Sequence, residues 1–398
     1  MTTTNGFDPT APLPGPPDPW SSTDTPARRS GPPYHMTEMI AAEPGLARRI
    51  LARHAGADSG AAALAAAVAE AARNDEPIIV TGCGTSEHAS LGVADILREA
   101  ARAAGLPGVG AVSAQAFELS LEPPGSGLVV GVSHEGATSA TNAALAAARD
   151  AGARTALITV TGRSPGAALA DIVLETGELD QSWCHTIGYV SPMLAASAVG
   201  AHLSGRALDG DTVARILADG TRDETGAERI AGHLADVARL IVIASGADRT
   251  AARELVLKVE EASWLPSAYR DLETFLHGHL PATGPDTGLV LILADRMARR
   301  ERLRRARGAL AAAHELGIRS AAILAADIAG DVDVALTPAG RLIASEASDL
   351  PAPVAALFAT ATPLQLITER LARARGTDPD PIRRDDPRYR AAADAAEG

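Results

Sequence analysis

The stretch GLVVGVSHEGATSATNAALAAARDAGARTALITVTG, residues 127–162, indicates the fold class of this chain. It begins with an apolar run that ends in a turn of small residues, continues as an alanine-rich helical pattern over 138–152, and closes with a second apolar run at 154–162. Apolar runs without clear alternation are typical of strands buried on both faces of a parallel sheet. Strand, helix and strand in this order predict a βαβ unit and a doubly wound α/β fold.

The same pattern recurs along the chain and predicts two such domains. LAAARDAGARTALIT (145–159) matches LAAAHELGIRSAAIL (310–324) at a constant spacing of 165 residues. We interpret this match as an internal duplication, with homologous domains at 55–207 and 225–372. Further strands are expected in the apolar runs at 77–84, 171–177, 239–246, 288–295, 319–327 and 331–338.

The segments outside these domains differ in composition. Residues 1–35 are rich in proline and cannot bury enough apolar surface to offset the entropy of ordering, so we expect disorder there. A cohesive pattern from Met36 predicts an N-terminal helix over 36–54. The polar tail at 373–398 is expected to pack across the two domains.

Charge and composition exclude several classes of protein. The 398 residues carry a net charge of −13, and the one arginine-rich stretch, 299–307, is interpreted as a solvated helix face, so no nucleic-acid partner is expected. The apolar stretches are too short for a membrane helix, and no secretory signal opens the chain, which predicts a cytoplasmic location without membrane contact. The chain has two cysteines without CxxC spacing, so no disulfide framework is expected. The sequence shows no credible cluster of metal ligands, and we expect neither a metal site nor a cofactor.

Two turns between a predicted strand and a predicted helix could bind an anion. TGCGTSEHAS (81–90) and GVSHEGATSA (131–140) place small and hydroxyl residues at helix starts. Backbone N–H groups at a helix N-terminus attract anions, and ligands of open α/β sheets bind beyond the carboxyl ends of strands. The alternative is that these serines and threonines only cap helices.

A third segment, ELVLKVEEASWLPSAYRDLETFLHGHL (254–280), begins as a predicted helix in the second domain. It contains Lys258, which is the only lysine of the chain, together with Glu261 and His277. A carboxylate and a histidine are the usual pair for proton transfer at neutral pH. The alternative is a charged helix without a catalytic role.

These three segments resemble the sugar isomerase (SIS) domain family. CGTSEHA (83–89) is similar to its CGTSxxA loop, and SHEGAT (133–138) to its SxSGxT loop. LKVEEASWLPSAYRDLETFLHG (257–278) resembles the KxxEISY…HG segment found in the isomerase half of glutamine–fructose-6-phosphate aminotransferases. The resemblance covers about residues 37–370 and implies two SIS-type domains.

The resemblance also implies roles for individual residues. Glu261 occupies the position of the base that moves a proton between C1 and C2, and Lys258 that of a lysine three residues before it. His277 occupies the position of a ring-opening histidine donated by the neighbouring subunit, which implies a homodimer with a shared active site. The implied substrate-binding residues are Cys83, Gly84, Thr85, Ser86, Ser133, His134, Glu135, Gly136 and Thr138, with His185, Thr186 and Ser191 as candidates from the loop at 181–192. A structural role for Trp183 and Cys184 in that loop is the alternative.

Three departures from the family pattern leave the substrate open. We expect no glutaminase domain, hence no ammonia from glutamine, and the tail has no lysine to form a Schiff base. Glu135 replaces the second serine of the phosphate loop, and a carboxylate about 4 Å from a phosphate costs on the order of 4 kcal/mol at an effective dielectric constant of 20. The ligand is therefore either phosphorylated, with Glu135 turned away or paired, or it is neutral or aminated.

The sequence thus predicts a sugar-phosphate or amino-sugar isomerase or deaminase that works through an enediol or enolamine. Two alternatives stay open: a sensor that binds a sugar phosphate without catalysis, and an isomerase altered for a non-phosphorylated sugar.

Overall fold

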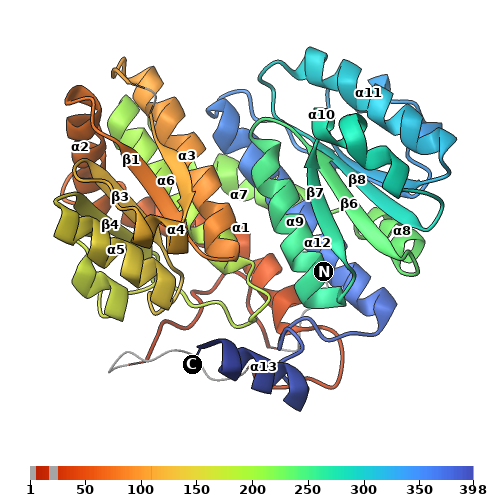
Figure 1. Cartoon of the computed structure of the whole chain (residues 1–398), viewed down its shortest axis with the longest axis horizontal. Coiled ribbons are helices and arrows are strands. Elements are labelled where there is room, and N and C mark those ends of the chain that lie inside the picture. Colours follow the sequence, from red (N-terminus) through yellow and green to blue (C-terminus); the bar gives the residue numbers. More distant parts are fainter. Residues whose placement is uncertain (1–5, 18–25, 109, 398) are drawn as a thin grey trace.

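The computed structural model describes residues 6–17, 26–108 and 110–397. It contains two five-stranded parallel sheets, one from each half of the chain (Figure 1). The strands of the first sheet are β1 Ile78–Gly82, β2 Val112–Gln115, β3 Leu128–Val132, β4 Arg154–Thr159 and β5 Ile172–Glu175. The strands of the second sheet are β6 Arg239–Ala244, β7 Ser267–Asp271, β8 Thr287–Leu293, β9 Arg319–Ala325 and β10 Gly340–Ala344.

The two sheets have the same topology, as the predicted duplication requires. Their strand orders, β2-β1-β3-β4-β5 and β7-β6-β8-β9-β10, correspond element by element. The matched segments are equivalent in detail, because Arg154 pairs with Leu128 on β3 and Arg319 pairs with Gly288 on β8. The glycines before them, Gly152 and Gly317, both adopt positive φ where a helix ends. The predicted α/β fold with two doubly wound sheets is confirmed.

Helices cover both faces of each sheet and share a central core. The first half contributes α1 His35–Arg53, α2 Gly60–Arg73, α3 Thr85–Ala103, α4 Ala116–Leu121, α5 Ser139–Ala151, α6 Ile187–Ser204 and α7 Gly210–Asp219. The second half contributes α8 Glu224–Leu234, α9 Asp248–Ser263, α10 Leu272–Thr274, α11 Arg299–Glu315, α12 Ala352–Arg375 and α13 Pro387–Glu397. Side chains from the inward faces of both sheets and from α1, α3, α6, α9 and α12 form one continuous apolar core. The two halves are therefore packed as one body.

The edge strands next to β1 and β6 differ from the sequence-based expectation. β2 and β7 were not predicted, because most of their side chains are half-buried and they lack an apolar run. The strand predicted at 331–338 is wrong. There the backbone forms 3-10 turns at Ala329–Asp331 and Val334–Leu336, and the Asp333 carboxylate accepts the N–H of Ala335 at 2.9 Å. The strand follows as β10.

The N-terminal segment was predicted to be disordered over 1–35, and residues 1–5 and 18–25 lie outside the described residues. Within residues 6–17, the backbone N–H of Leu13 donates to Glu178 at 2.9 Å, and Leu13 is buried. The predicted helix over 36–54 is present as α1. No helix in the described parts of the chain is long and apolar enough to cross a membrane.

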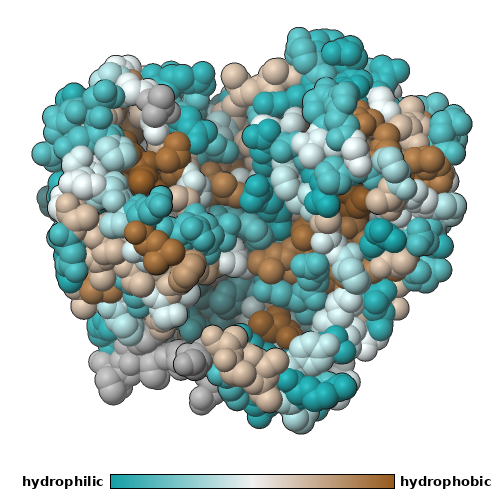
Figure 2. All heavy atoms as spheres, viewed as in Figure 1, coloured by the Kyte–Doolittle hydropathy of each residue, from teal (hydrophilic) through white to brown (hydrophobic). Residues whose placement is uncertain are grey.

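The C-terminal segment contacts both halves of the molecule. The carbonyl of Asp380 accepts the N–H of Trp183 at 3.0 Å, and its carboxylate accepts the N–H of Met36 at 2.9 Å. On the other side, the guanidinium of Arg375 donates to the carbonyl oxygens of Ser263 and Ala235. In Figure 1, α13 lies below both lobes, and Figure 2 shows that the surface is hollowed between the lobes above this segment.

Candidate functional site

The turn after β1 leads directly into α3 at the point of the first sheet where the strand order reverses. Cys83 is half-buried and accepts a hydrogen bond from the Thr141 hydroxyl at 3.7 Å. Gly84 is exposed, Thr85 is buried at the first position of α3, and Ser86 is half-buried beside it. The N-terminus of α3 therefore opens beyond the carboxyl end of the sheet, where an anion could bind.

The turn after β3 lies beside it and leads into α5. The Ser133 hydroxyl donates to the Thr138 hydroxyl at 3.3 Å, while Thr138 precedes the first residue of α5 and is exposed. Gly136 has φ +69°, and a Cβ there would lie 2.2 Å from the Ser164 hydroxyl oxygen. Only glycine fits this backbone without strain. Glu135, the residue that departs from the family pattern, is half-buried.

Two neutral histidines connect the second turn to the loop at 181–186. His134 is buried, and its Nε2 accepts the backbone N–H of Asp180 at 2.9 Å, so that the neutral ring carries its proton on Nδ1. Its ring centroid lies 5.2 Å from that of His185. Burial lowers the pKa of His134 to about 3, and burial together with the charge of Lys258 lowers the pKa of His185 to about 3. Both rings are therefore uncharged at neutral pH.

The positive charge that acts on His185 is the ammonium of Lys258 on α9, the only lysine of the chain. Two glutamates on the same helix lie beside it. Lys258 is completely buried and forms ion pairs with Glu261, one turn later, and with Glu254 at 3.7 Å, one turn earlier. Burial lowers the pKa of Lys258, but the charges of Glu261 and Glu254 and the hydrogen bond to Glu261 raise it, and the net shift is upward. Burial likewise raises the pKa of Glu261, opposed by the Lys258 ammonium. The thiol of Cys184 lies close enough to donate to Glu261, and burial raises the pKa of this thiol well above its usual value.

Glu254 extends this network to the first half of the chain. Its Oε2 lies 2.8 Å from Nδ1 of His88, which is in the first turn of α3. The imidazole of His88 and the ammonium of Lys258 thus stand on either side of a carboxylate whose side chain is only 1% exposed. A chain of contacts runs from α3 through Glu254 and Lys258 to Glu261.

Glu261 is also accessible from outside. It lines a cavity of about 450 Å³ together with Trp264 and the C-terminal residues Arg383 and Tyr389. The Arg383 guanidinium lies 4.4 Å from the Trp264 ring centroid and 4.0 Å from that of Tyr389. These stacked groups hold the C-terminal segment beside the Glu261 carboxylate.

The structure does not bring all predicted site residues together within one chain. His277 has a 74% exposed side chain and contacts Glu273 at 3.2 Å and Arg305 on α11 at 3.4 Å. The segment 254–280 is interrupted by β7, so that His277 follows an edge strand instead of continuing α9. Ser191 was expected in the loop at 181–192, but it lies within α6 and is buried. Thr186, the residue that precedes α6, is buried as well.

Three residues of this arrangement were not predicted to take part. Glu254 and His88 lie in the quoted motifs, but they are far apart in sequence and nothing local pairs them. Arg383 lies in a tail whose polar composition indicates only exposure. Cys184, expected to be structural, packs in an apolar cluster with Met36 and Ala262 as well as facing Glu261.

Several solved structures have a similar fold over almost their whole length. The C-terminal domain of glucosamine-fructose-6-phosphate aminotransferase from Francisella tularensis aligns with a TM-score of 0.74 at 18% identity, covering 89% of this chain and 99% of that one. Tagatose-6-phosphate ketose/aldose isomerase from Escherichia coli aligns with a TM-score of 0.69 at 20% identity, covering 90% and 97%. Glucosamine-6-phosphate deaminase from Thermotoga maritima aligns with a TM-score of 0.62 at 15% identity, covering 87% and 96%.

By sequence, no family model and no curated protein matches the chain. The structural neighbours extend over almost the whole length of this chain and of their own, and they include the type of isomerase domain that the sequence motifs resemble. The chain therefore has the two-sheet fold of the SIS-domain phosphosugar isomerases.

Proposed function

We propose that this protein is a sugar-phosphate or amino-sugar isomerase or deaminase in which Glu261 moves a proton between C1 and C2, without hydrolysis of glutamine. The observation that supports the proposal most directly is the pair of Lys258 and Glu261. A carboxylate with a buried ammonium on one side faces a cavity on the other. The structural neighbours named for phosphosugar isomerases and for a glucosamine-6-phosphate deaminase support the same class of reaction.

The chemistry needs one base that reaches two adjacent carbons. Glu261 removes the proton from the carbon next to the carbonyl group, and the electron pair of that C–H bond forms the C1=C2 double bond of the enediol while the carbonyl oxygen takes up a proton. Return of the proton to the other carbon, together with loss of the hydroxyl proton from the oxygen on the carbon deprotonated first, forms the new carbonyl group and completes the isomerisation. Burial raises the pKa of Glu261 above its ordinary value, and a raised pKa favours a carboxylate that must both accept and return a proton.

Lys258 and His185 have distinct roles in this proposal. Lys258 positions Glu261 and balances its charge in a buried site. His185, uncharged and half-buried, could donate one hydrogen bond and accept another at the substrate oxygens. The turns at 83–86 and 133–138, with Gly84, Thr85, Ser86, Ser133, Gly136 and Thr138, would hold the anionic or hydroxyl end of the sugar. For an amino sugar, the same proton transfer through an enolamine would give an imine at C2, and water would hydrolyse that C=N bond to a carbonyl group with release of ammonia.

His277 would act from a neighbouring subunit, as in the family that the sequence resembles. Its exposed position on the outer face of the second half is compatible with donation to another chain. The proposed active enzyme is therefore a homodimer with a shared site.

Replacement of the base tests the proposal. Glu261→Gln should lower kcat for interconversion of hexose 6-phosphates, or for ammonia release from their 2-amino forms, by about 10²–10⁴-fold, because it removes the general base. Ligand binding, measured by thermal shift, should change little. Glu301→Gln is the matched control, since this exposed carboxylate on α11 does not line the cavity beside Glu261. Unchanged turnover in Glu261→Gln would contradict the mechanism, and binding without any product in the wild type would favour a sensor.

A further inference from the structure

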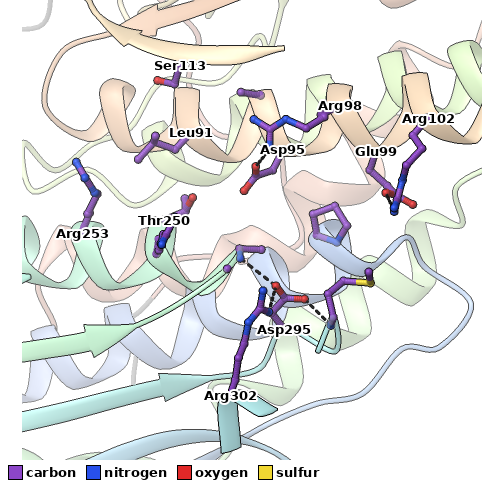
Figure 3. Close-up of a pocket in the computed structure, with 16 residues that line it drawn as sticks. Leu91, Asp95, Arg98, Glu99, Arg102, Ser113, Thr250, Arg253, Asp295 and Arg302 are labelled. Carbon is purple, nitrogen blue, oxygen red and sulfur yellow. Dashed lines mark hydrogen bonds and ion pairs between the residues drawn. The ribbon is translucent and has the colours of Figure 1, made fainter. Parts of the chain in front are cut away.

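A second cavity, of about 540 Å³, lies between the two halves of the molecule (Figure 3). One wall is α3, and the other is formed by the start of α9 and the turn after β8. It is separate from the cavity beside Glu261, and the two share no lining residue. Its walls carry five arginines: Arg98, Arg102, Arg249, Arg253 and Arg302.

The turns that face this cavity are the counterparts of the two anion-binding turns in the first half, since β6 and β8 correspond to β1 and β3. Their backbone donors, however, are already occupied by the chain itself. The buried Asp248 carboxylate accepts the N–H groups of Ala294 at 2.8 Å and of Asp295 at 2.9 Å. The Asp295 carboxylate accepts those of Ala247 at 3.0 Å and of Met297 at 2.9 Å. A ligand anion here must be held by side chains.

Four of the arginines have a carboxylate partner. Arg98 pairs with Asp95 at 2.6 Å, Arg102 with Glu99, and Arg302 with Asp295. Arg249 pairs with Asp271 at 2.6 Å through its Nε, and a guanidinium has further donors.

The fifth arginine differs from the others. Among the described residues no carboxylate lies within ion-pair distance of Arg253, whose guanidinium lies 5.2 Å from the Tyr269 ring centroid. Figure 3 shows Arg253 reaching from α9 toward Leu91 on α3. The cavity wall therefore carries one cation that is not neutralised, with Arg249 one turn before it on the same helix face.

We infer that this cleft binds a phosphate monoester, with Arg253 and Arg249 on the phosphate. Guanidinium groups match the geometry of phosphate oxygens and bind them through two parallel donors. Thr250 and Ser113 provide hydroxyls, and Leu91 and Met297 provide apolar surface, for the organic part of the ligand. The inference goes beyond the proposed function and does not depend on it, because none of these residues belongs to the proposed catalytic site.

Methionine provides a native probe for each of the two sites. The chain has five methionines, of which Met297 lines this cleft and is 47% exposed, while Met36 is buried in the cluster with Cys184 near the proposed active site. In protein labelled with ¹³C at the methionine methyl groups, the Met297 signal is assigned from its loss in Met297→Leu. Glucose 6-phosphate, inorganic phosphate and glucose are then titrated separately.

We expect the Met297 signal to shift in a saturable way with glucose 6-phosphate but not with glucose. A response to inorganic phosphate as well would show that the phosphate group itself is recognised. Arg253→Gln should weaken the binding reported by Met297 by about tenfold or more, the loss expected for a charge-assisted hydrogen bond. The exposed Arg73, at the end of α2, gives the matched control Arg73→Gln, which should leave the titration unchanged.

Other outcomes separate this inference from the proposed function. Glu261→Gln should leave the Met297 titration unchanged even if it abolishes turnover. A shift confined to Met36, or a Met297 affinity that Arg253→Gln does not alter, would overturn the cleft site while leaving the catalytic proposal intact.

Discussion

Nδ1 of His88 lies 2.8 Å from Oε2 of Glu254, and this contact joins α3 of the first half to α9 of the second. The two residues are 166 positions apart in the sequence. On the other side of Glu254 stands Lys258, at 3.7 Å, which in turn pairs with Glu261. The contact therefore orients the helix that carries the proposed base relative to the turns at 83–86 and 133–138, for which we propose a role in substrate binding.

Removal of His88 should destabilise the protein. In His88→Ala the buried Glu254 carboxylate keeps only Lys258, and an under-satisfied buried acceptor costs about 1–3 kcal/mol. Chemical denaturation of wild type, His88→Ala, Glu254→Gln and the double variant gives the coupling energy. A coupling energy near zero would show that the contact contributes nothing to the packing of the two halves.

Mixing of two inactive variants tests the shared active site. If His277 acts across a twofold axis, Glu261→Gln and His277→Ala homodimers are both inactive, while a mixed dimer contains one intact site. Random exchange of subunits should restore roughly a quarter of the wild-type activity. Light scattering establishes the oligomeric state of each sample. If the mixture stays inactive although subunits exchange, His277 does not serve the neighbouring site.

Gly136→Ala should disrupt the turn after β3. The substitution combines a positive φ with a Cβ 2.2 Å from the Ser164 hydroxyl oxygen, so we expect a loss of more than about 2 kcal/mol in the free energy of unfolding. Gly205→Ala is the matched control, since it has φ +67° with no atom within 4 Å of the added Cβ, and it should cost only about 1–2 kcal/mol. Equal losses in the two variants would mean that the Ser164 contact relaxes freely.

The lowered pKa of His185 predicts a loss of stability in acid. The pKa of His185 is about 3 in the folded protein, against an ordinary value of 6.5, so that between these values the unfolded state binds more protons. Stability from this residue is full above about pH 6.5 and falls as the pH decreases toward 3, with a slope of about 1.4 kcal/mol per pH unit. Asp248, whose pKa burial raises to about 7, acts in the opposite direction. The comparison must therefore be made between variants.

His185→Asn should remove its share of this dependence. Between about pH 4 and 6, the free energy of unfolding of the variant should rise less steeply with pH than that of the wild type, by about 1.4 kcal/mol per pH unit. Urea denaturation across this range measures both slopes. His233→Asn, at the end of α8 and exposed, is the control that should follow the wild type. Parallel curves for His185→Asn and the wild type would mean that His185 is protonated in the folded protein.

The repeated βαβ pattern was available from the sequence alone because its signals are local. Apolar runs and glycine at helix ends are set by neighbouring residues, and the recurrence of the same local pattern 165 residues later can be read directly from the sequence. The strands without such a signal, β2 and β7, were missed, since an edge strand that is half-buried needs no continuous apolar run. The run at 331–338 was predicted to be a strand, but a side-chain cap at Asp333 stabilises a turn there instead.

The sequence likewise indicated Lys258 and Glu261 as candidates, through the residue types in the segment 254–280 and its resemblance to the SIS family, and the structure pairs the two one helical turn apart. Only the tertiary structure decided that Glu254 and His88 complete their network and that Arg383 stacks beside the cavity at Glu261. The tertiary structure also shows that β7 lies between Glu261 and His277 in the chain. Because of this strand, the two side chains lie on different surfaces of one chain. The physical reason is that burial and charge pairing between distant segments depend on how the two halves pack, which no local pattern encodes.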